Sequence, residues 1–338
     1  MKRFPASVLI LLIFSLGVAV APARASETYT LTLATWGAPS HPHESLFAKQ
    51  FIDLVEKNSK GQIKFKYFSR GTMVKQSTVP EALIRGSVDI ALTIIDSWAG
   101  RHADVSVTAT PLWTLSMEQD AQALLPGRPL YDHFNKLLQA DGVELLCLFD
   151  IGPTVIVSKA PLREPADIRG KVIRSLSKGS AQVLQALGAS PIVLNVGDVY
   201  SALQRGTIDG AMNGIQGAAG LKYSEVVGNV LVPNGVMGTL ISGYAMNRKK
   251  LMSLPPELRN VVTQAALEVR NTAQQKMVSG YFDYLKELEK EGMKSIVLRR
   301  DTKEWNAWSQ ALGDFRTSAA KEYSPEVLRL IKTSAANP

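Results

Sequence analysis

Two stretches of the chain carry the same pattern, VPEALIRGSVDIAL at residues 79–92 and VYSALQRGTIDGAM at residues 199–212. They are offset by 120 residues, and seven of the fourteen positions are identical. Each stretch predicts the end of a helix, a glycine stop, a short turn and an aspartate that leads into a strand. Gly86 and Gly206 suit the left-handed conformation that closes a helix. We interpret the echo as two lobes of similar design; the alternative is a chance match between two common helix-to-strand turns.

Strand and helix patterns alternate along the rest of the chain. Alternating apolar residues predict half-buried strands at 29–33 and 63–67, and residues 44–57 place their apolar side chains on one helical stripe. Further strands are expected at 89–95, 143–149, 154–157, 171–174, 192–194 and 240–246. This alternation predicts α/β architecture with mostly parallel sheets. Two such lobes favour capture of a small ligand, because pockets commonly lie between domains.

A long helix is expected near the C-terminus. Apolar residues recur at spacings of three and four from Leu258 to Leu288, after Pro255 and Pro256 and before Gly292. Proline is tolerated at a helix start and glycine is common after a helix end. About 30 residues of helix measure roughly 45 Å. That length exceeds one small domain, so we expect the helix to run across two.

The first 25 residues have the features of a secretory signal peptide. Lys2 and Arg3 precede the apolar run 8–20, and Ala23 and Ala25 are the small residues that a signal peptidase reads. The alternative is a membrane anchor, but an apolar run of about 13 residues is short of the roughly 20 that span a bilayer. We therefore predict cleavage after Ala25, export to the periplasm and no direct membrane insertion of the mature chain.

Composition and charge exclude several classes of protein. The 338 residues are 46% hydrophobic and 20% charged, which is typical of globular domains. The net charge is +8; without the predicted signal peptide, which carries three cations and no acids, it is +8 − 3 = +5. The basic residues are scattered and form no run with interleaved aromatics, so no nucleic-acid partner is expected. The single cysteine, Cys147, excludes an internal disulfide framework and is interpreted as a core residue.

Motifs of catalysis are missing from the sequence. It contains no GxSxG, P-loop, GxGxxG or HExxH pattern. The run His41-Pro42-His43-Glu44 resembles a metal cluster, but Pro42 keeps it from helical geometry, so we interpret it as a loop that enters a helix. We expect no enzyme activity, no catalytic residue, no metal and no cofactor. An exported hydrolase remains a remote alternative.

Two polar residues stand at the ends of predicted strands. Arg174 closes the strand 170–174, which is otherwise largely apolar, and Asn213 closes the run 207–213. A guanidinium presents a planar fork that matches a carboxylate, and an amide can both donate and accept. Both residues are therefore candidates for binding an organic anion. The alternatives are a surface ion pair for Arg174 and a turn residue for Asn213.

Several ordered motifs resemble those of one family. DIRGKVIR (167–174), GASPIVL (188–194), DVYSALQRGTIDGAMNG (198–214) and PPELRNVVTQAA (255–266) are similar to segments of solute-binding proteins of tripartite ATP-independent periplasmic (TRAP) transporters, the DctP family. The resemblance extends over essentially the whole mature chain. It implies a two-lobed periplasmic binding protein (type II-like) with crossing hinge strands and a long domain-spanning helix.

The resemblance also implies a division of the chain and a partner. Members deliver small organic anions, mostly carboxylates, to the membrane subunits of a TRAP permease, and they are not enzymes. We expect the mature protein to be a monomer. The expected parts are a signal peptide at 1–25, lobe 1 at 26–150 plus about 240–279, and lobe 2 at 151–239 plus about 280–338.

The resemblance assigns roles to individual residues. Arg174 matches the arginine that clamps the ligand carboxylate, and Asn213 matches the asparagine that helps to fix it. Thr154 stands two residues after Gly152, where many members have a second arginine. Further candidates for the cleft lining are Trp36, Ile94, Ser97, Ser177 and Val196, and Trp98 is a candidate for an apolar wall together with Trp36.

The loss of a second arginine bears on the ligand. With Thr154 in its place, the sequence favours a monocarboxylate with an apolar or aromatic body over an acid held by paired arginines. A dicarboxylate, a sugar acid and a sulfonate stay open as alternatives. So does a binding protein of another transporter class.

Overall fold

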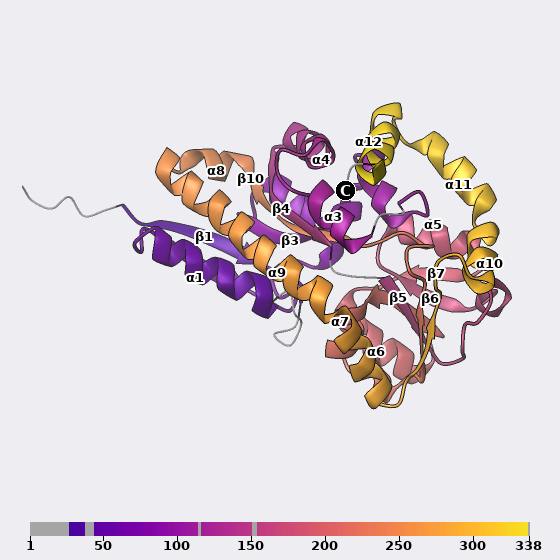
Figure 1. The fold of residues 1–338 in the computed structure, drawn as a ribbon. Helices are drawn as coiled ribbons and strands as arrows, with labels where there is room; N and C mark the ends of the chain where they lie inside the picture. Colours follow the sequence, from indigo (N-terminus) through magenta and orange to yellow (C-terminus); the bar gives the residue numbers. More distant parts are fainter. Residues whose placement is uncertain (1–26, 38–43, 114–115, 151–153, 337–338) are drawn as a thin grey trace, which may run out of the picture.

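The chain folds around two β-sheets, one of five strands and one of six (Figure 1). The computed structural model describes residues 27–37, 44–113, 116–150 and 154–336. The predicted signal peptide, the histidines of the 41–43 run and the Gly152-Pro153 pair lie outside the described residues. We call the part built on the five-stranded sheet the first lobe and the part built on the six-stranded sheet the second lobe.

The sheet of the first lobe combines parallel and antiparallel pairs. Strand β1 pairs in parallel with β2 and β3, whereas β10 runs antiparallel to β3 and β4. In spatial order the strands are β2 (Ile63–Phe68), β1 (Tyr29–Ala34), β3 (Ile90–Ile94), β10 (Ile241–Asn247) and β4 (Val143–Asp150).

The sheet of the second lobe is mixed in the same way. Strand β6 pairs in parallel with β7 and β8, whereas β5 runs antiparallel to β8 and β9. In spatial order the strands are β11 (Lys294–Val297), β9 (Asn229–Val232), β5 (Thr154–Ser158), β8 (Gly210–Gly214), β6 (Val172–Ser175) and β7 (Ser190–Val193).

The expectation of mostly parallel sheets is confirmed, and two crossings between the sheets explain the exceptions: among the described strands only β10 in the first sheet and β5 in the second run against their neighbours. The chain passes from the first sheet to the second between β4 and β5, and it returns between β9 and β10. A strand that enters a sheet from the other lobe need not run in the direction set by a local strand–helix–strand unit. Strands were found at all eight stretches where strand patterns were identified, whereas the four-residue strands β9 and β11 were not predicted.

The repeated sequence pattern folds in the same way in both lobes. Helix α2 (Val79–Arg85) ends at Gly86 with φ of 70°, and helix α6 (Val196–Arg205) ends at Gly206 with φ of 75°. The amide of residue 87 donates to the Ala82 carbonyl, and the amide of residue 207 donates to the Ala202 carbonyl, both over 3.0 Å. The interpretation as two lobes of similar design is confirmed.

The aspartate of the pattern has the same task in each lobe. One carboxylate oxygen of Asp89 accepts the amide of Thr32 at 2.7 Å, and one of Asp209 accepts the amide of Val172 at 2.8 Å. Each donor amide belongs to the strand that lies beside the one the aspartate leads into. Each aspartate therefore ties the incoming strand to its parallel neighbour.

The predicted long helix joins the two lobes. Helix α9 (Pro256–Lys290) contacts α1 (Lys49–Asn58) and β4 in the first lobe, and α7 (Ile215–Gly220) and β11 in the second (Figure 1). Its Leu258 and Val262 belong to the large hydrophobic core, whereas Leu285 and Leu288 belong to the core of the second lobe. None of the described helices combines the length and the apolar character that a membrane crossing requires.

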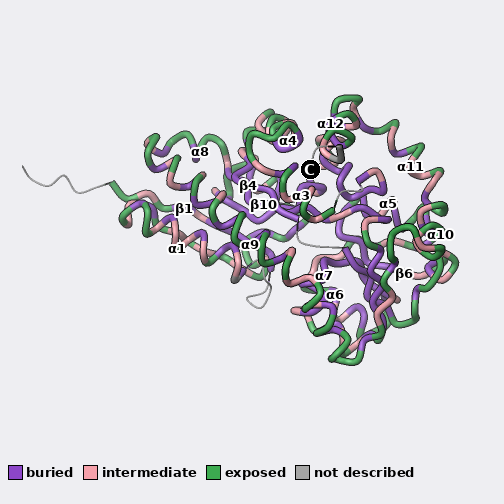
Figure 2. The backbone as a smooth tube through the Cα atoms, in the orientation of Figure 1, coloured by how far each residue is buried: buried purple, intermediate pink, exposed green. Residues whose placement is uncertain are grey.

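The remaining helices cover the sheets and bury their central strands, whereas the edge strands β2, β7 and β11 stay partly exposed (Figure 2). The helix expected at 44–57 begins with a π-helical turn, Glu44–Ala48, before α1. The other α-helices are α3 (Met117–Ala123), α4 (Pro129–Ala140), α5 (Lys178–Ala186), α8 (Arg248–Ser253), α10 (Lys303–Ala311), α11 (Gly313–Ala319) and α12 (Pro325–Ala336).

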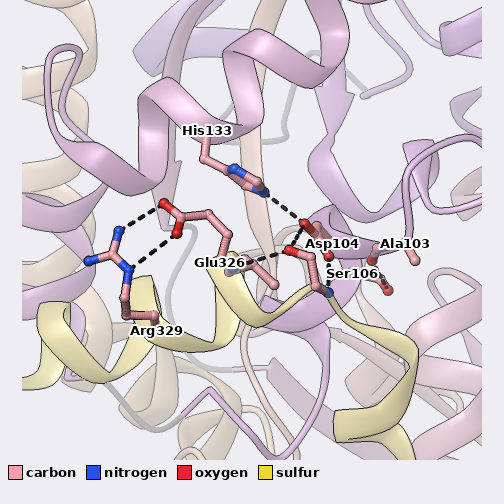
Figure 3. A network of polar contacts seen from close by, with 8 residues as sticks. Ala103, Asp104, Ser106, His133, Glu326 and Arg329 are labelled. Atoms are coloured by element: carbon pink, nitrogen blue, oxygen red, sulfur yellow. Dashed lines mark hydrogen bonds and ion pairs between the residues drawn. The ribbon is translucent and has the colours of Figure 1, made fainter.

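The C-terminal helix returns to the first lobe. Helix α12 contacts α3 and α4, and Asp104 fastens its start: the carboxylate accepts the Ser324 hydroxyl at 2.6 Å and pairs with His133 of α4 at 2.8 Å (Figure 3). Although burial acts in the opposite direction, the hydrogen bonds from Ser324 and His133 lower the pKa of Asp104. The division that assigned 280–338 to the second lobe stays a prediction.

Candidate functional site

Arg174 is a fully buried cation on β6, with 0% of its surface exposed. Its Nε donates to the carbonyl of Leu194 at 3.0 Å, and its Nη1 donates to the carbonyl of Met212 at 2.9 Å. The third nitrogen, Nη2, is buried without a hydrogen-bond partner. Among the described residues, no carboxylate forms an ion pair with Arg174. The alternative interpretation of Arg174, a surface ion pair, is therefore wrong for the described residues.

The two carbonyls orient the guanidinium but leave its charge uncompensated. Burial lowers the pKa of Arg174, and the nearby Tyr223 acts in the opposite direction. Even so, an arginine keeps its proton in proteins, because its ordinary pKa lies above 12. A buried charge without a partner is costly. The arrangement is therefore suited to an anion that arrives from outside the chain.

Asn213 lies beside Arg174 on the neighbouring strand, β8. Residue 174 pairs with Ala211 across the two parallel strands, and Asn213 follows two positions later on the same face. Its Nδ2 donates to the Tyr223 hydroxyl at 3.3 Å, and its Oδ1 accepts the amide of Gly214 at 2.9 Å. Asn213 is therefore a strand residue, not a turn residue. Burial raises the pKa of Tyr223 to about 12, against the effect of Arg174, so this phenol stays neutral at pH 7.

A cleft of about 250 Å³ lies between the two lobes, and the residues that line it do not include Arg174 or Asn213. Asn195 and Val196, which line it, directly follow the residue whose carbonyl anchors Arg174. On the other side, the Nε2 of Gln76 donates across the lobes to the carbonyl of Leu176, two residues after Arg174, at 3.4 Å. The lining residues are Trp36, Arg70, Gly71, Lys75, Gln76, Asn195, Val196, Gly197, Asp198 and Leu221.

The residues predicted for the cleft lining fall into two groups. Trp36 and Val196 line the cleft, one from each lobe. Ile94 and Trp98 are buried in the large hydrophobic core, and the indole Nε1 of Trp98 donates to Thr93 at 3.0 Å. Trp98 is thus fixed as a core side chain, and any contact of Ile94 or Trp98 with a ligand stays a prediction.

The polar candidates have local partners. The Ser97 hydroxyl donates to the carbonyl of Ile94 at 2.6 Å, and Ser177 caps the start of α5, where its Oγ accepts the amide of Ser180 at 3.4 Å. Thr154 is buried at the start of β5, opposite Gly214 of β8. Thr154, which stands where the family resemblance places a second arginine, therefore lies next to Asn213 and brings no charge. A ligand contact by these three residues stays a prediction.

One acid at the seam was missed by the sequence analysis. Asp96, directly after β3, is buried against the start of α5 in the other lobe: its Oδ1 lies 2.9 Å from where a side-chain carbon on Gly179 would be. Burial raises the pKa of Asp96 to about 6, although Ser177 and the amide of Gly179 act in the opposite direction. A glycine in the run Ser177-Lys178-Gly179 was the available signal, because only a missing side chain permits this approach.

Tyr223, Arg70 and Lys75 were also missed. Tyr223 holds Asn213 in place, and the two cations line the cleft from the first lobe. Arg70 stands directly before Gly71 and just after β2, so a turn at the end of a strand was the available signal. Neither cation has the ordered motif around it that marked Arg174.

Two α/β lobes, two crossings and one shared helix define the class of two-lobed solute-binding proteins. The solved structure of the sugar acid binding protein DctPAm from Advenella mimigardefordensis, in complex with galactonate, has the same fold. It superposes with a TM-score of 0.83 at 22% identity, covering 91% of this chain and 99% of that one. A TRAP periplasmic solute-binding protein from Sulfurospirillum deleyianum with bound succinate superposes with a TM-score of 0.82 at 21% identity, covering 91% and 99%.

The sequence comparisons identify the family. Residues 33–320 match the model of the bacterial extracellular solute-binding protein family 7, DctP. The 2,3-diketo-L-gulonate-binding periplasmic protein YiaO of Escherichia coli is 26% identical over 273 residues, which cover 80% of this chain and 81% of that protein. The chain belongs to the DctP family, whose members are periplasmic solute receptors of TRAP transporters.

Proposed function

We propose that this protein captures a small organic acid in the periplasm, by its carboxylate, and delivers it to the membrane subunits of a TRAP permease. The observation that carries the proposal is the Nη2 of Arg174, which is buried, unpartnered and part of a cation with no ion pair among the described residues. The predicted signal peptide, with cleavage after Ala25, would direct the chain to that compartment. We propose that the mature protein acts there as a monomer.

The carboxylate is received by groups that are already oriented. The bonds from Arg174 to the carbonyls of Leu194 and Met212 fix the plane of the guanidinium, so little side-chain entropy is lost when the ligand binds. Nη2 then donates to the carboxylate, and the amide of Asn213 lies on the adjacent strand as a second partner. A charge-assisted bond inside a buried site is stronger than one between neutral groups.

Closure of the lobes completes the capture. Trp36 in the first lobe and Val196 in the second face the same cleft, so both lobes contact a ligand that lies there. Such a ligand shifts an existing equilibrium between open and closed forms toward the closed form, because only the closed form offers it both sets of contacts. The permease would recognise the closed form.

The ligand class is supported by the relatives at a coarse level. YiaO is named for 2,3-diketo-L-gulonate, and the two solved structures contain galactonate and succinate, so each of the three bears a carboxylate. The finer prediction, a monocarboxylate with an apolar or aromatic body, is based on Thr154 and on the indole wall of Trp36. Sugar acids, dicarboxylates and sulfonates are its competitors.

The experiment begins with the mature protein and a panel of organic acids in a thermal-shift screen. A ligand that binds only the folded form raises the melting temperature. Calorimetry with the best acid then compares the wild type with Arg174→Ala. We expect the variant to lose about 2–5 kcal/mol of binding free energy, because the ligand charge is left buried and unpaired. Wild-type affinity in a folded Arg174→Ala variant would refute the proposal.

A further inference from the structure

A second cavity, of about 300 Å³, lies where the two lobes are joined. Its wall includes Asp150, the last residue of β4 before the first crossing, and Thr239, on the return between β9 and β10. Tyr281 and Phe282 line it from α9, the helix that the lobes share. Both crossings and the shared helix therefore meet at this cavity, and neither residue of the proposed carboxylate clamp lines it.

Asp150 connects these three segments by hydrogen bonds. Its amide donates to the Oε1 of Gln274 on α9 at 2.9 Å, and its Oδ1 accepts the hydroxyl of Thr239 at 3.3 Å. A second carboxyl group, that of Asp120, lies next to Asp150 and within reach of its charge. The backbone around the cavity is thus held in place before any ligand binds.

Asp120 has an acceptor atom that the described residues do not serve. The side chain lines the cavity, only 1% of the residue is exposed, and its Oδ1 has no hydrogen-bond partner among them. Leaving a buried carboxylate oxygen without a donor is costly. A donor that enters the cavity from outside the chain would remove that cost.

The charge of the lining favours a positively charged donor. Among the described residues of the wall, the acids Glu118, Asp120 and Asp150 outnumber the one cation, Arg300. Two adjacent carboxyl groups that hold one proton between them still carry one negative charge. A concave surface lined by charge of one sign attracts small ions of the opposite sign.

The apolar part of the wall is largely aromatic. Trp113 is buried at the cavity, and the rings of Tyr281 and Phe282 contact each other with centroids 4.8 Å apart. Phe282 is 65% exposed, so a molecule that arrives from the solvent can reach its ring. The faces of aromatic rings attract cations, because the ring quadrupole places negative charge there.

The size of the cavity favours an organic cation over a metal ion. About 300 Å³ lies within the range of pockets for small molecules, and a bare ion would leave most of it unfilled. In the part of the chain that the structure describes, no group of three or more His, Cys, Asp or Glu residues could hold a metal. Carboxylates beside aromatic rings are instead suited to an ammonium or amidinium group with an apolar body.

We propose that the second cavity is a binding site for a small organic cation with an aromatic or other apolar body. The cationic group donates to the Oδ1 of Asp120, and the body packs against Tyr281 and Phe282. This site lies apart from Arg174, so the inference goes beyond the proposed function and does not depend on it.

The experiment uses matched compounds that differ in charge. The pairs are benzylammonium and benzyl alcohol, phenethylammonium and phenethyl alcohol, and benzamidinium and benzamide, each titrated calorimetrically into the mature protein. We expect at least one cation to bind once per chain and ten-fold or more tightly than its neutral counterpart. In Asp120→Asn, which keeps the shape of the side chain, that preference should fall at least five-fold, while the affinity for the neutral compound stays unchanged.

Two further variants place the bound cation in this cavity. Phe282→Ala removes an exposed ring, so the variant should fold, and we expect it to lower the affinity for both members of the pair at least three-fold. Asp53→Asn is the matched control for charge, because it removes an exposed acid of α1 that does not line the cavity, and it should keep the preference for the cation.

The proposed site is also tested against the carboxylate clamp. Arg174→Ala should bind the cation as tightly as the wild type, because Arg174 does not line this cavity. The inference is refuted if no cation binds, if the neutral compounds bind as tightly, or if Asp120→Asn keeps the preference. Failure of the cations to bind would leave the capture of an organic acid by Arg174 untouched, and a panel without a binding acid would leave this site untouched.

Discussion

Arg174 and Arg270 are both buried arginines that donate to backbone carbonyls, yet their surroundings differ in one respect. Arg270, on α9, bonds through Nε to the Leu148 carbonyl at 2.9 Å, through Nη1 to the Asn271 side chain at 3.1 Å and through Nη2 to the Ala121 carbonyl. Arg174 bonds in the same way through two nitrogens, but its Nη2 has no partner. Burial of an arginine is thus no sign of a binding site by itself; what sets Arg174 apart from Arg270 is the guanidinium nitrogen without a partner.

The largest expected effect comes from replacing each of these arginines with lysine. A lysine keeps the charge but loses the planar fork. For Arg174→Lys we expect ligand affinity to fall by about 2–5 kcal/mol, roughly 30-fold to several thousand-fold, in calorimetry with the best acid of the panel. Arg270→Lys should leave the affinity within about two-fold but lower the melting temperature, because it leaves buried carbonyls unbonded. Equal losses of affinity in the two variants would remove the distinction.

The contrast between the two arginines also shows which features of the fold and the site could be predicted from the sequence. Arg174 was a candidate because it closes an apolar strand, and the family resemblance gave it its role. The two lobes and the long helix followed from the repeat at Gly86 and Gly206 and from the pattern of α9, whereas the crossing strands were implied by the resemblance. Nothing in the sequence around Arg270 indicates that it is buried, because helical periodicity does not reveal what packs on a helix that serves two lobes. The carbonyls that anchor Arg174 belong to other strands, so only the folded sheet brings them together.

The sequence could not predict which tryptophans and which single cations line the cleft. Trp36 and Trp98 were both expected as cleft walls, but Trp36 lines the cleft whereas Trp98 is a core side chain with its N–H bonded to Thr93. Both follow strands of the first sheet, and their surroundings depend on contacts from distant segments. In the sequence, Arg70 and Lys75 look like solvent-exposed surface residues, because a single cation after a strand is common. Their place in a cleft depends on the opposite lobe.

The next largest effect is expected when the protein itself supplies the missing anion. In Asn213→Asp a carboxylate replaces the amide next to Arg174, with nearly the same shape. An internal charge pair should compete with the ligand, and we expect affinity to fall by about 2 kcal/mol or more, roughly 30-fold. The ligand-free variant should melt no lower than the wild type, because its buried cation is now paired.

A second buried asparagine of the same sheet is the control for that substitution. Asn229 on β9 donates to the carbonyl of Lys159 at 2.8 Å, and the structure gives it no arginine partner. Asn229→Asp should leave ligand affinity unchanged and lower the melting temperature, because it buries an unpaired charge beside a carbonyl oxygen. If both variants lower the melting temperature equally, the buried charge of Arg174 does not lack a counter-ion.

A buried acid pair completes the comparison, since a carboxyl group can take up a proton where an arginine keeps its charge. Asp120 on α3 and Asp150 at the end of β4 line a second cavity, of about 300 Å³. Burial and then the neighbouring charge of Asp150 hold the pKa of Asp120 well above its usual value. The raised pKa favours the protonated form of Asp120, so this pair can lower its charge by taking up a proton.

The acid pair predicts a pH dependence of stability. Because the pKa of Asp120 is higher in the folded than in the unfolded chain, its contribution is most favourable below about pH 4 and declines as the pH rises through the folded-state pKa. Asp120→Asn removes that decline. Each unit of raised pKa corresponds to about 1.4 kcal/mol, so we expect urea unfolding to show a gain of at least that size at pH 8 relative to pH 4. The same gain at both pH values would contradict a shared proton.

The smallest effect is expected at the phenol that orients Asn213. Tyr223→Phe removes the hydroxyl that accepts from the Nδ2 of Asn213 but keeps the buried ring. One neutral hydrogen bond contributes about 0.5–1.5 kcal/mol, so ligand affinity should fall roughly two- to twelve-fold in calorimetry. Tyr200→Phe is the matched control, because that hydroxyl donates at 2.7 Å to Glu225 at the surface and its loss should leave affinity unchanged. A Tyr223→Phe variant with wild-type affinity would show that Asn213 needs no support from this hydroxyl.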